Sequence, residues 1–363
     1  MRTAAFRNLA DAAVTTEAKN IFLVGENGQG KTNFLEALYF CAYGSSFRKV
    51  HDSEIAERTQ KDFSAEITMR SSATDRNSVL IKIEAGKKTV FIDGKKVQDR
   101  KELLSVIPCI VFCHEDMEFV AGSPERQRWF FDQVLSLYDP VYLDDLRCYR
   151  RVLKSRNAVL RDYVLRRQDG GSETLLDALD QQCALYGTKL MEKRETAAAL
   201  FSEIFALLYE EVSGIAGVNI RYLPSWKSYN EAEAVDALRK RRPAETAAVL
   251  SLSGPHRDRY LFARDGADFA GSASTGQRRL LALLLRVAQA RRFSEMTGRN
   301  PILLLDDVLL EMDGEKRRRF IAALPAYDQA FYTFLPEEPF QRYRDSGTLV
   351  YYVRDGRIEA EGQ

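Results

Sequence analysis

A glycine-rich segment near the start of the chain constrains its fold more than any other feature. Residues 25–32 read Gly-Glu-Asn-Gly-Gln-Gly-Lys-Thr and match the phosphate-loop pattern G-x-x-x-x-G-K-[ST] at every position. The apolar run Asn20–Val24 predicts a buried strand before this loop, and Lys31–Tyr43 carries apolar residues at helical spacing after it. A strand, such a loop and a helix predict a nucleotide-binding α/β domain. The alternative, a glycine-rich turn with a chance lysine, is disfavoured by the flanking elements.

Each position of this pattern has a chemical reason. Glycines let backbone N–H groups curl around an anion, and the start of the following helix adds partial positive charge. The Lys31 ammonium can reach the β- and γ-phosphates, and the Thr32 hydroxyl can ligate Mg²⁺. The sequence therefore predicts a site for a nucleotide and Mg²⁺ with the loop residues Gly25, Glu26, Asn27, Gly28, Gln29, Gly30, Lys31 and Thr32.

A pair of carboxylates lies late in the chain. Asp306 and Asp307 directly follow the apolar run Ile302–Leu305, which predicts a second buried strand. Carboxylates at the carboxyl end of such a strand lie where an α/β sheet places its ligands. We expect Asp306 to hold Mg²⁺, and Asp307 to orient the attacking water or accept its proton, with Lys31 and Asp307 as catalytic residues. The alternative is a pair of loop or helix-capping aspartates.

A second anion-binding pattern precedes these aspartates. Ser274-Thr275-Gly276-Gln277 comes just before an apolar segment that begins at Leu280 and predicts a helix. A serine hydroxyl, a glycine backbone and a helix N-terminus can together bind phosphate oxygens, so Ser274, Gly276 and Gln277 are predicted nucleotide ligands. Taken alone, the pattern fits an ordinary helix N-cap equally well.

The spacing of the motifs and the pattern of apolar residues divide the chain into a split domain and an insertion. Asp306 is far in sequence from Lys31, so a large insertion separates two halves of one nucleotide domain. Residues 123–247 are poor in glycine and carry apolar residues at helical spacing. We expect them to form an α-helical arm, with residues 1–122 and 248–363 as the head.

Shorter signals predict the elements within each part. Apolar or alternating runs predict strands at residues 65–69, 79–83, 89–92, 107–113 and 349–353. The first three are expected in an antiparallel sheet, with a hairpin turn at Asp93-Gly94. In the insertion, Gly170-Gly171 predicts a break between two long helices, the second of which covers Glu173–Val212.

Composition excludes several classes of protein. The chain has 53 Lys and Arg against 52 Asp and Glu, which excludes a uniformly basic nucleic-acid coat but leaves room for a local basic patch. No apolar run approaches the roughly 20 residues of a membrane span, so we expect no membrane partner. The five cysteines are an odd number without a CxxC pair, which indicates a reducing cytoplasm rather than a disulfide framework or a zinc site.

The insertion contains one local basic patch. Residues 147–167 carry eight Arg and Lys side chains and one acid, Asp162. Such a helix is an electrostatic footprint for the DNA phosphate backbone. The predicted DNA contacts are Arg147, Arg150, Arg151, Lys154 and Arg156. An equally weighted alternative is a solvated helix face whose charges are balanced by acids on neighbouring helices.

Further motifs narrow the family. The phosphate loop, the Ser274–Gln277 signature and the aspartate pair, in this order, resemble the ABC-type ATPase heads of the SMC superfamily. The chain resembles the bacterial RecF DNA-repair proteins in particular, through Phe6-Arg7-Asn8, Lys31–Asn33, Leu35–Ala37, Ser46–Arg48, Gly122–Pro124 with Arg126, Gly254–Asp258 and Leu303–Val308. The likeness covers almost the whole chain except the region around residues 165–245. It implies an α/β fold: an ABC-type P-loop ATPase head, with a mixed sheet and an antiparallel subdomain, plus an inserted α-helical arm.

The resemblance also implies an activity and partners. Such proteins are cytoplasmic, bind ATP with Mg²⁺ and form an ATP-dependent homodimer. They act at junctions of single- and double-stranded DNA with RecR, RecO and RecA, in repair, replication restart and SOS induction. The resemblance implies that Ser274 contacts the ATP of the partner subunit, as a third catalytic residue, and that Arg7 and Asn8 lie near the nucleotide of their own subunit. ATP hydrolysis is expected to be weak, stimulated by DNA and used as a switch.

Some positions depart from the family pattern. Leu310 replaces the serine that is usual after the aspartate pair. Phe334 follows Thr333 where hydroxyl residues are usual, so sensing of the γ-phosphate would rest on Thr333 alone. Glu115 and Asp116 are the candidates for the Q-loop position, where a glutamine is usual.

Alternatives remain open for one motif and for the function. His256 and Arg257, in the turn-like Gly254–Asp258, fit a hydrogen-bonded structural turn as well as a nucleotide or DNA contact. Two other classes of protein share the phosphate loop: small-molecule kinases, and structural nucleotide-binding subunits that do not hydrolyse ATP. The long insertion and the Ser274–Gln277 signature disfavour the kinase. Loss of hydrolysis in an Asp307→Asn variant would exclude the structural subunit.

Overall fold

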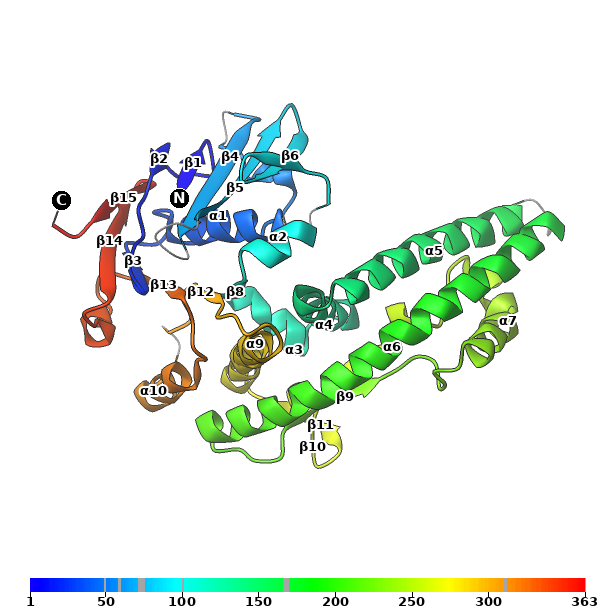
Figure 1. Ribbon diagram of the computed structural model, residues 1–363. Coiled ribbons are helices and arrows are strands. Elements are labelled where there is room, and N and C mark those ends of the chain that lie inside the picture. Colours follow the sequence, from blue (N-terminus) through cyan, green and yellow to red (C-terminus); the bar gives the residue numbers. More distant parts are fainter. Residues whose placement is uncertain are drawn as a thin grey trace. The chain divides into compact units, whose positions relative to one another are not determined.

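The computed structural model describes residues 1–48, 50–57, 60–70, 76–99, 101–165, 170–309 and 312–362. The chain forms two compact units, which are described separately (Figure 1). The first, called the split unit, consists of Met1–Glu115 and Phe293–Gln363, and the second, the inserted unit, is Asp116–Arg292. Residues 116–122 and 248–292 thus pack with the insertion, whereas the division made from the sequence placed them with the head.

A largely parallel six-stranded sheet forms one layer of the split unit. Its strands run in the order β15-β14-β3-β13-β12-β8. They are β3 (Asn20–Val24), β8 (Cys109–Phe112), β12 (Ile302–Leu305), β13 (Gln329–Phe334), β14 (Thr348–Arg354) and β15 (Arg357–Ala360), with β15 antiparallel to its neighbour. All of β3 and β8 is buried, as expected for short apolar runs in a sheet covered on both faces. Because β3, β13 and β12 are parallel neighbours, β3 and β12 end at the same edge of the sheet.

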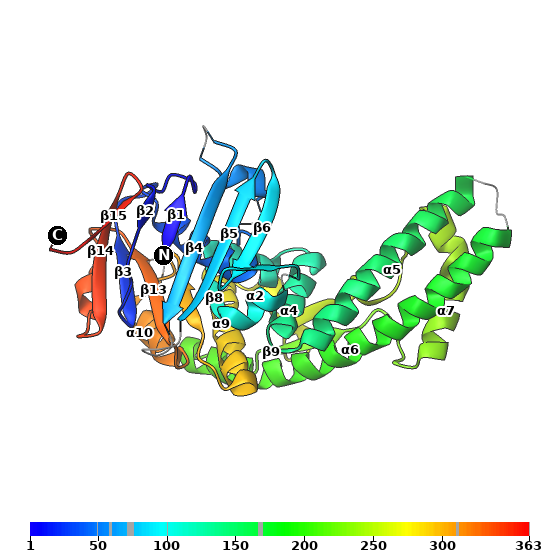
Figure 2. The same cartoon turned by 45° about the horizontal axis from the view of Figure 1, so that its top comes forward.

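An antiparallel sheet forms the second layer of the split unit (Figure 2). Its strands run in the order β2-β1-β4-β5-β6-β7. They are β1 (Arg2–Ala4), β2 (Ala12–Ala13), β4 (Phe63–Arg70), β5 (Arg76–Glu84), β6 (Lys87–Ile92) and β7 (Lys95–Val97). Buried residues alternate along β4 from Phe63 through Ala65 to Ile67, which gives the sheet one apolar face.

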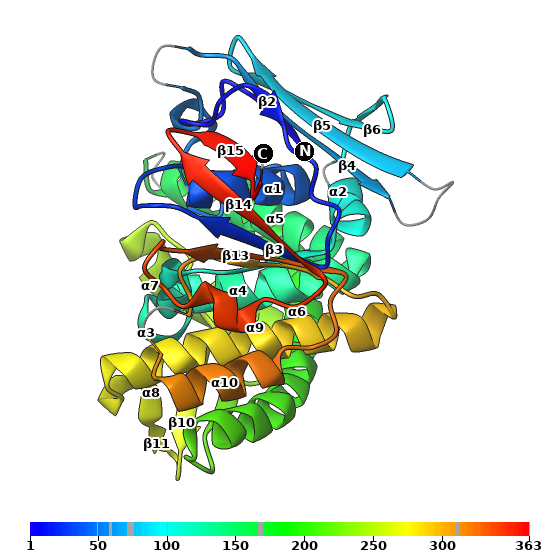
Figure 3. The ribbon, with the colours of Figure 1, turned by 90° about the vertical axis from the view of Figure 1, so that its left-hand side faces the viewer.

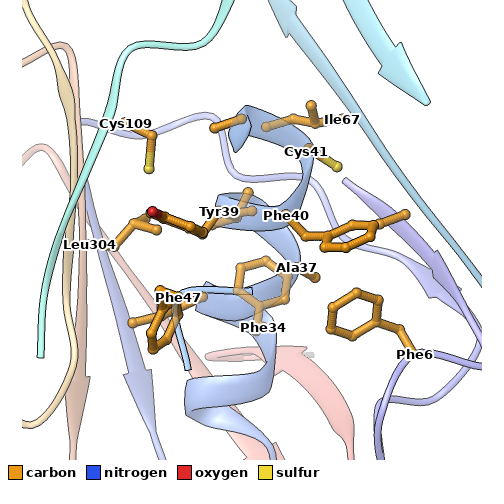
Figure 4. Packing of buried hydrophobic residues seen from close by; sticks show 14 of the residues in the cluster. Phe6, Phe34, Ala37, Tyr39, Phe40, Cys41, Phe47, Ile67, Cys109 and Leu304 are labelled. Carbon is orange, nitrogen blue, oxygen red and sulfur yellow. The ribbon is translucent and has the colours of Figure 1, made fainter. Parts of the chain in front are cut away.

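One helix fills the space between the two sheets (Figure 4). Helix α1 (Lys31–Tyr43) contacts β4 and β5 of the antiparallel sheet and β8 and β13 of the parallel sheet. Its apolar side chains, among them Phe34 and Phe40, are buried, and Phe40 and Phe6 pack edge to face with ring centroids 5.9 Å apart. Burial on all sides fixes the first turn of α1 and therefore the loop before it. The remaining elements of this unit are α2 (Lys101–Val106), α10 (Gly314–Ala323), and the 3₁₀ turns η1 (Asp52–Glu54) and η4 (Phe340–Tyr343).

Helices make up most of the inserted unit. They are α3 (Glu118–Ala121), α4 (Pro124–Tyr138), α5 (Pro140–Leu165), α6 (Gly170–Ser213), α7 (Glu231–Ala248), α8 (Phe269–Ser272) and most of α9 (Thr275–Thr297). A small sheet contains β9 (Asn219–Leu223), β10 (Arg259–Arg264) and β11 (Ala267–Asp268), and η3 (Pro255–Arg257) is a 3₁₀ turn. The 3₁₀ turn η2 (His114–Met117) contains residues of both units. Helices α5 and α6 lie side by side along much of their length (Figures 1 and 2). Among the described residues, no helix combines the length and apolar character needed to cross a bilayer.

Most elements predicted from the sequence are confirmed. The strands expected at residues 20–24, 65–69, 79–83, 89–92, 302–305 and 349–353 lie within β3, β4, β5, β6, β12 and β14, and the strand expected at 107–113 is shorter. Asp93 and Gly94 have φ of 49° and 73° and form the predicted hairpin turn. The two long helices predicted on either side of Gly170-Gly171 are α5 and α6, although the two glycines are themselves the first residues of α6. A glycine pair costs little in a first turn, where the N–H groups have no intrahelical partner.

Candidate functional site

The glycine-rich loop lies between the end of β3 and the start of α1. Gly28 and Gly30 have φ of 80° and 118°, which is backbone geometry that side chains disfavour. Gly25 has an ordinary φ, but a Cβ there would overlap the carbonyl oxygen of Val353. Because α1 begins at Lys31, the positive end of its dipole faces the loop. The loop therefore has the shape and field of an anion-binding site.

The side chain of Lys31 is held inside this loop. It is 4% exposed, and its Nζ donates to the carbonyl oxygens of Gly25 at 2.5 Å and Glu26 at 3.0 Å. Among the described residues, no carboxylate forms an ion pair with Lys31. The ammonium therefore lies at the loop without a compensating negative charge, and phosphate oxygens would supply one.

The carboxyl edge of the parallel sheet brings Thr32 and Asp306 together. Thr32 is in the first turn of α1, and Asp306 directly follows β12. The Thr32 hydroxyl donates to Asp306 Oδ1 at 2.8 Å. The pKa of Asp306 is raised to about 7, chiefly by burial and also by the adjacent carboxylate of Asp307, while the hydrogen bond from Thr32 acts in the opposite direction. The structure thus pairs the two residues that the sequence predicted as Mg²⁺ ligands.

This oxygen pair fits Mg²⁺. A hydroxyl and a carboxylate are hard donors, and Mg²⁺ keeps several water or phosphate ligands of its own, so two protein ligands suffice. Burial and the adjacent Asp307 carboxylate raise the pKa of Asp306, and a bound cation would offset both effects. Among the described residues, no cluster of three acid, cysteine or histidine side chains forms a metal site of another kind.

Thr333 binds both the backbone and the carboxylate of the second aspartate, Asp307. Asp307 has φ of 51°, an unusual backbone for an aspartate. Its N–H donates to Thr333 Oγ1 at 2.8 Å, and the Thr333 hydroxyl lies 2.9 Å from Asp307 Oδ1 and 3.4 Å from Asp306 Oδ1. Thr333 is buried in β13. The Thr333 hydroxyl therefore orients the carboxylates, and its expected role in sensing the γ-phosphate stays a prediction.

Arg7 and Arg48 converge on a buried carboxylate of α1. Glu36 is fully buried and accepts two hydrogen bonds from Arg7, from Nε at 3.0 Å and Nη2 at 2.8 Å. Arg48 Nη1 lies 3.3 Å from the same carboxylate, and the Ser46 hydroxyl also donates to it. The sequence assigned no role to Glu36, although an acid within an apolar helical run is a signal of a buried ion pair. The expected contact of Arg7 with nucleotide stays a prediction.

Asn8 binds the loop itself. Its Nδ2 donates to the Gly28 carbonyl at 3.0 Å, and its Oδ1 accepts a hydrogen bond from Asn33 Nδ2 at 2.6 Å. Asn33 belongs to α1. Asn8 therefore ties the top of the loop to the helix that follows it, and its predicted contact with the nucleotide remains a prediction.

The hairpin formed by β14 and β15 also reaches the loop (Figure 3). The Asp355 N–H donates to Gln29 Oε1 at 2.6 Å, and the Gly356 N–H donates to the Gln29 carbonyl at 2.9 Å. Gln29 was predicted as a nucleotide ligand, and in this structure its side chain binds the hairpin. The Asp-Gly dipeptide signals a turn in the sequence but gives no indication of what that turn contacts.

The Ser274–Gln277 signature lies at the start of α9, in the inserted unit. The Ser274 N–H donates to Gln277 Oε1 at 2.8 Å, and the Gln277 N–H donates to Ser274 Oγ at 3.3 Å. This reciprocal pair is a capping box. Ser274 and Gly276 are exposed, and a Cβ at Gly276 would meet open space. The N-cap geometry is therefore present, and both residues remain accessible to a ligand.

The two Q-loop candidates separate in the structure. Asp116 is buried and accepts from Arg286 Nη2 at 2.8 Å and Nε at 3.1 Å, so its carboxylate is occupied within the inserted unit. Glu115 is exposed, and its charge contributes to the raised pKa of Asp306. Glu115 is therefore the better candidate. Leu310 lies outside the described residues.

The other departure from the family pattern, Phe334, has a packing role. It is 1% exposed in β13, and its ring packs against that of Phe22 with centroids 4.9 Å apart. A hydroxyl in its place would bury a polar group in this aromatic cluster. At this position the chain therefore has a phenylalanine that packs in the core of the parallel sheet in place of a hydroxyl residue.

One of the five arginines and lysines predicted to bind DNA does not face solvent. Arg156 is fully buried in the inserted unit, with its Nε 2.6 Å from Asp180 Oδ1, its Nη2 2.7 Å from Glu245 Oε2, and its Nη1 donating to Ser251 at 2.7 Å. The prediction of a DNA contact was wrong for Arg156 in this structure. The acids that balance its charge come from α6 and α7, far away in sequence.

The other four basic residues lie on the surface of α5. Arg151 and Lys154 are exposed. Arg150 is exposed along most of its side chain and lies 3.1 Å from Asp132, and Arg147 lies 3.7 Å from Asp144. Their role as DNA contacts remains a prediction.

The Gly254–Asp258 motif forms a tightly bonded turn. Asp258 is buried and accepts hydrogen bonds from Arg194 Nη1 at 2.8 Å and from the Ser225 N–H at 2.8 Å. His256 bonds the Tyr149 hydroxyl through Nδ1 and the Ser251 carbonyl through Nε2, and burial lowers its pKa to about 4. These contacts favour the structural role for His256. Arg257, which bonds the same carbonyl, is exposed.

Comparison with known proteins gives one consistent result. The family model of the RecF/RecN/SMC N terminal domain matches residues 1–358. A DNA replication and repair protein RecF of Treponema pallidum is 44% identical over 353 residues, 97% of each chain, and one of Pelotomaculum thermopropionicum is 33% identical over 336 residues, 90% of this chain and 91% of the other.

Solved structures agree in fold. The recombination mediator protein RecF-ATP of the RecFOR pathway matches with a TM-score of 0.90 at 26% identity, covering 99% of this chain and 96% of the other. An Smc head domain from Pyrococcus furiosus, bound to the C-terminal domain of ScpA, matches with a TM-score of 0.53 at 14% identity and shows the fold alone. The α/β ATPase-head fold predicted from the sequence is confirmed.

Proposed function

The chain belongs to the bacterial RecF family of the SMC superfamily of ABC-type ATPases, and from this premise we propose that it is an ATP-binding DNA-repair protein of the RecFOR pathway. ATP and Mg²⁺ bind at residues 25–32 and Asp306. ATP binding joins two copies of the chain into a clamp on single-stranded or gapped DNA in the cytoplasm. RecR, RecO and RecA are the pathway partners, and replication restart and SOS induction are the processes served.

The observation that carries this proposal is the hydrogen bond between Thr32 and Asp306 beside the Lys31 ammonium. Residues from the two ends of the chain meet there with the chemistry of a nucleotide–metal site. Lys31 would exchange its carbonyl partners for the β- and γ-phosphates, and Thr32 and Asp306 would hold Mg²⁺. When bound, Mg²⁺ neutralises phosphate charge and orients the γ-phosphate.

Asp307 is the residue proposed to act on the attacking water. Thr333 holds its carboxylate through a hydrogen bond of 2.9 Å and its backbone through one of 2.8 Å. From this position Asp307 would orient the water and accept its proton. Hydrolysis is weak, stimulated by DNA, and opens the clamp, so it serves as a switch.

The dimer would be completed by the signature at the start of α9. Ser274 and Gly276 are exposed, and a helix N-terminus favours an anion. In the closed dimer, Ser274, Gly276 and Gln277 would contact the γ-phosphate held by the other subunit. The capping box between Ser274 and Gln277 fixes the geometry of this surface before the nucleotide arrives.

DNA contact is proposed for the exposed side of α5. Arg147, Arg150, Arg151 and Lys154 have side chains on the surface, whereas Arg156 is excluded by its burial. These residues would bind the phosphate backbone without reading the sequence. Binding should therefore weaken steeply as salt concentration rises.

The test is the solution mass of an Asp307→Asn variant, which keeps the nucleotide site and slows hydrolysis. With ATP and Mg²⁺ the mass should rise from the 41.3 kDa of one chain to twice that value, and without nucleotide it should not. A Lys31→Ala variant, which loses the phosphate contact, is the control and should stay monomeric.

A monomer with bound ATP, both with and without DNA, would contradict the clamp and favour the single-site alternatives: a kinase, or a structural subunit. Undiminished hydrolysis in Asp307→Asn would contradict its role.

A further inference from the structure

The turn that joins β14 and β15 contacts the phosphate loop through Gln29. Asp355 and Gly356 have φ of 46° and 76°, which is the geometry of a tight hairpin turn. Gly356 is buried although most hairpin tips are exposed. The hairpin of β14 and β15 (Figure 3) therefore packs against the loop.

Gln29 is bound at both its main chain and its side chain by this turn. Its Oε1 accepts the Asp355 N–H at 2.6 Å, and its carbonyl oxygen accepts the Gly356 N–H at 2.9 Å. The Gly356 carbonyl in turn accepts the Ala10 N–H at 3.0 Å. The turn thus connects the loop with the segment near the start of the chain.

Close packing adds to these hydrogen bonds. A Cβ on Gly356 would overlap the carbonyl oxygen of Asn8 and lie 3.1 Å from the Ala10 nitrogen. Asn8 is the residue whose side chain donates to the Gly28 carbonyl. A shift of Asn8 would therefore move its partner in the loop. Gly356 touches the loop by two routes, directly through Gln29 and indirectly through Asn8.

We infer that the Asp355-Gly356 turn is a positioning element that holds the phosphate loop in the shape needed for ATP. The loop needs Gly28 and Gly30 in left-handed conformations so that its N–H groups converge. Glycines lose the most conformational freedom when they are ordered. Contacts that hold the loop in this shape before ATP binds reduce the entropy cost of ordering it on binding. This inference rests on the proposed function.

The chain contains a matched control for a substitution at this turn. Asp93-Gly94, between β6 and β7, is the same dipeptide with nearly the same φ, 49° and 73°. A Cβ at Gly94 would meet nothing within 4 Å. Gly94→Ala therefore carries the backbone strain of Gly356→Ala without the contact with Asn8.

The experiment compares Gly356→Ala with Gly94→Ala in the full chain. The dissociation constant for a fluorescent ATP analogue with Mg²⁺ should rise at least about tenfold in Gly356→Ala and stay within about twofold in Gly94→Ala. Thermal midpoints should be recorded for both, and binding measured well below them. Equal affinities in the two variants would overturn the inference.

A second variant keeps the test valid if Gly356→Ala does not fold. Gln29→Met keeps the size of the side chain and removes the acceptor for the Asp355 N–H. The dissociation constant for ATP should rise roughly fivefold, because the loop loses one of its two hydrogen bonds from the turn. A merely structural role for Gln29 would leave the ATP affinity unchanged and overturn the inference. If the unaltered chain binds no ATP, the proposed function fails as well.

Discussion

Two buried cations show how differently the two units use charge. Lys31, in the split unit, is 4% exposed and donates to carbonyl oxygens of its own loop. Arg156, in the inserted unit, is fully buried and paired with the carboxylates of Asp180 and Glu245. In the proposed function, the counter-ion of Lys31 is the phosphate of ATP, whereas the charge of Arg156 is already neutralised by carboxylates of the protein. The partners of a basic residue, rather than its neighbours in sequence, decide whether it serves binding or stability.

The largest effect expected from this comparison is on stability. Arg156→Met should lower the free energy of unfolding by about 3 to 5 kcal/mol, because two buried carboxylates lose their partner. Denaturant unfolding measures this change. Arg151→Met, on the exposed side of the same helix, is the control and should change the free energy by no more than about 0.5 kcal/mol.

Arg156→Met should also leave ATP affinity within about twofold when it is measured far below the unfolding midpoint, since the partners of Arg156 are Asp180, Glu245 and Ser251 of the inserted unit. A loss of stability as small as that of Arg151→Met would break the comparison. It would mean that Arg156 is solvated in the working protein and could again be considered for DNA binding.

Lys31→Met should show the opposite pattern. The affinity for ATP should fall by about 100-fold, which corresponds to about 2.7 kcal/mol, because the ammonium contact with the phosphates is lost. The free energy of unfolding should change by less than about 1 kcal/mol, since the ammonium is bonded to backbone carbonyls that can bind water instead. Calorimetry and denaturant unfolding measure the two quantities.

Lys88→Met is the matched control for Lys31→Met. Lys88 is also poorly exposed in the split unit, but it is paired with Asp52 at 2.6 Å. Its loss should lower stability and leave ATP affinity unchanged. If Lys31→Met destabilised the chain as much as Lys88→Met while ATP affinity was retained, Lys31 would be a structural residue and the comparison would fail.

The parts of the fold that could be predicted are those determined by residues close together in the sequence. The strand–loop–helix around residues 25–32, the strand before Asp306 and the turn at Asp93-Gly94 are each encoded within about a dozen residues. Periodicity and turn chemistry act at that range, so these elements were predicted with nearly correct bounds. Thr32 and Asp306 could be paired because they follow β3 and β12, two strands that end at the same edge of a parallel sheet.

The parts that could not be predicted depend on partners distant in sequence. Glu36 forms ion pairs with Arg7 and Arg48, which lie in two different loops. Gln29 is bound by a hairpin far along the chain. The charge count around Arg156 suggested a DNA surface because the acids that neutralise it lie on two other helices. A sequence shows the sign of a charge but not which distant side chain it faces.

The smallest expected effect concerns the exposed side of α5. Replacing Arg151 and Lys154 together by Gln should weaken binding to gapped DNA by on the order of tenfold at low salt, and reduce the slope of log affinity against log salt by about 1 to 2. Each lost phosphate contact releases one counter-ion fewer, so the slope counts contacts and is insensitive to a general loss of folding.

The control removes the same charge from α10. Replacing Arg318 and Arg319 together by Gln, where both residues pair locally with Glu315, should leave the slope unchanged. Equal slopes in the two double variants would mean that Arg151 and Lys154 do not contact DNA phosphates. The DNA-binding surface would then lie elsewhere than on α5.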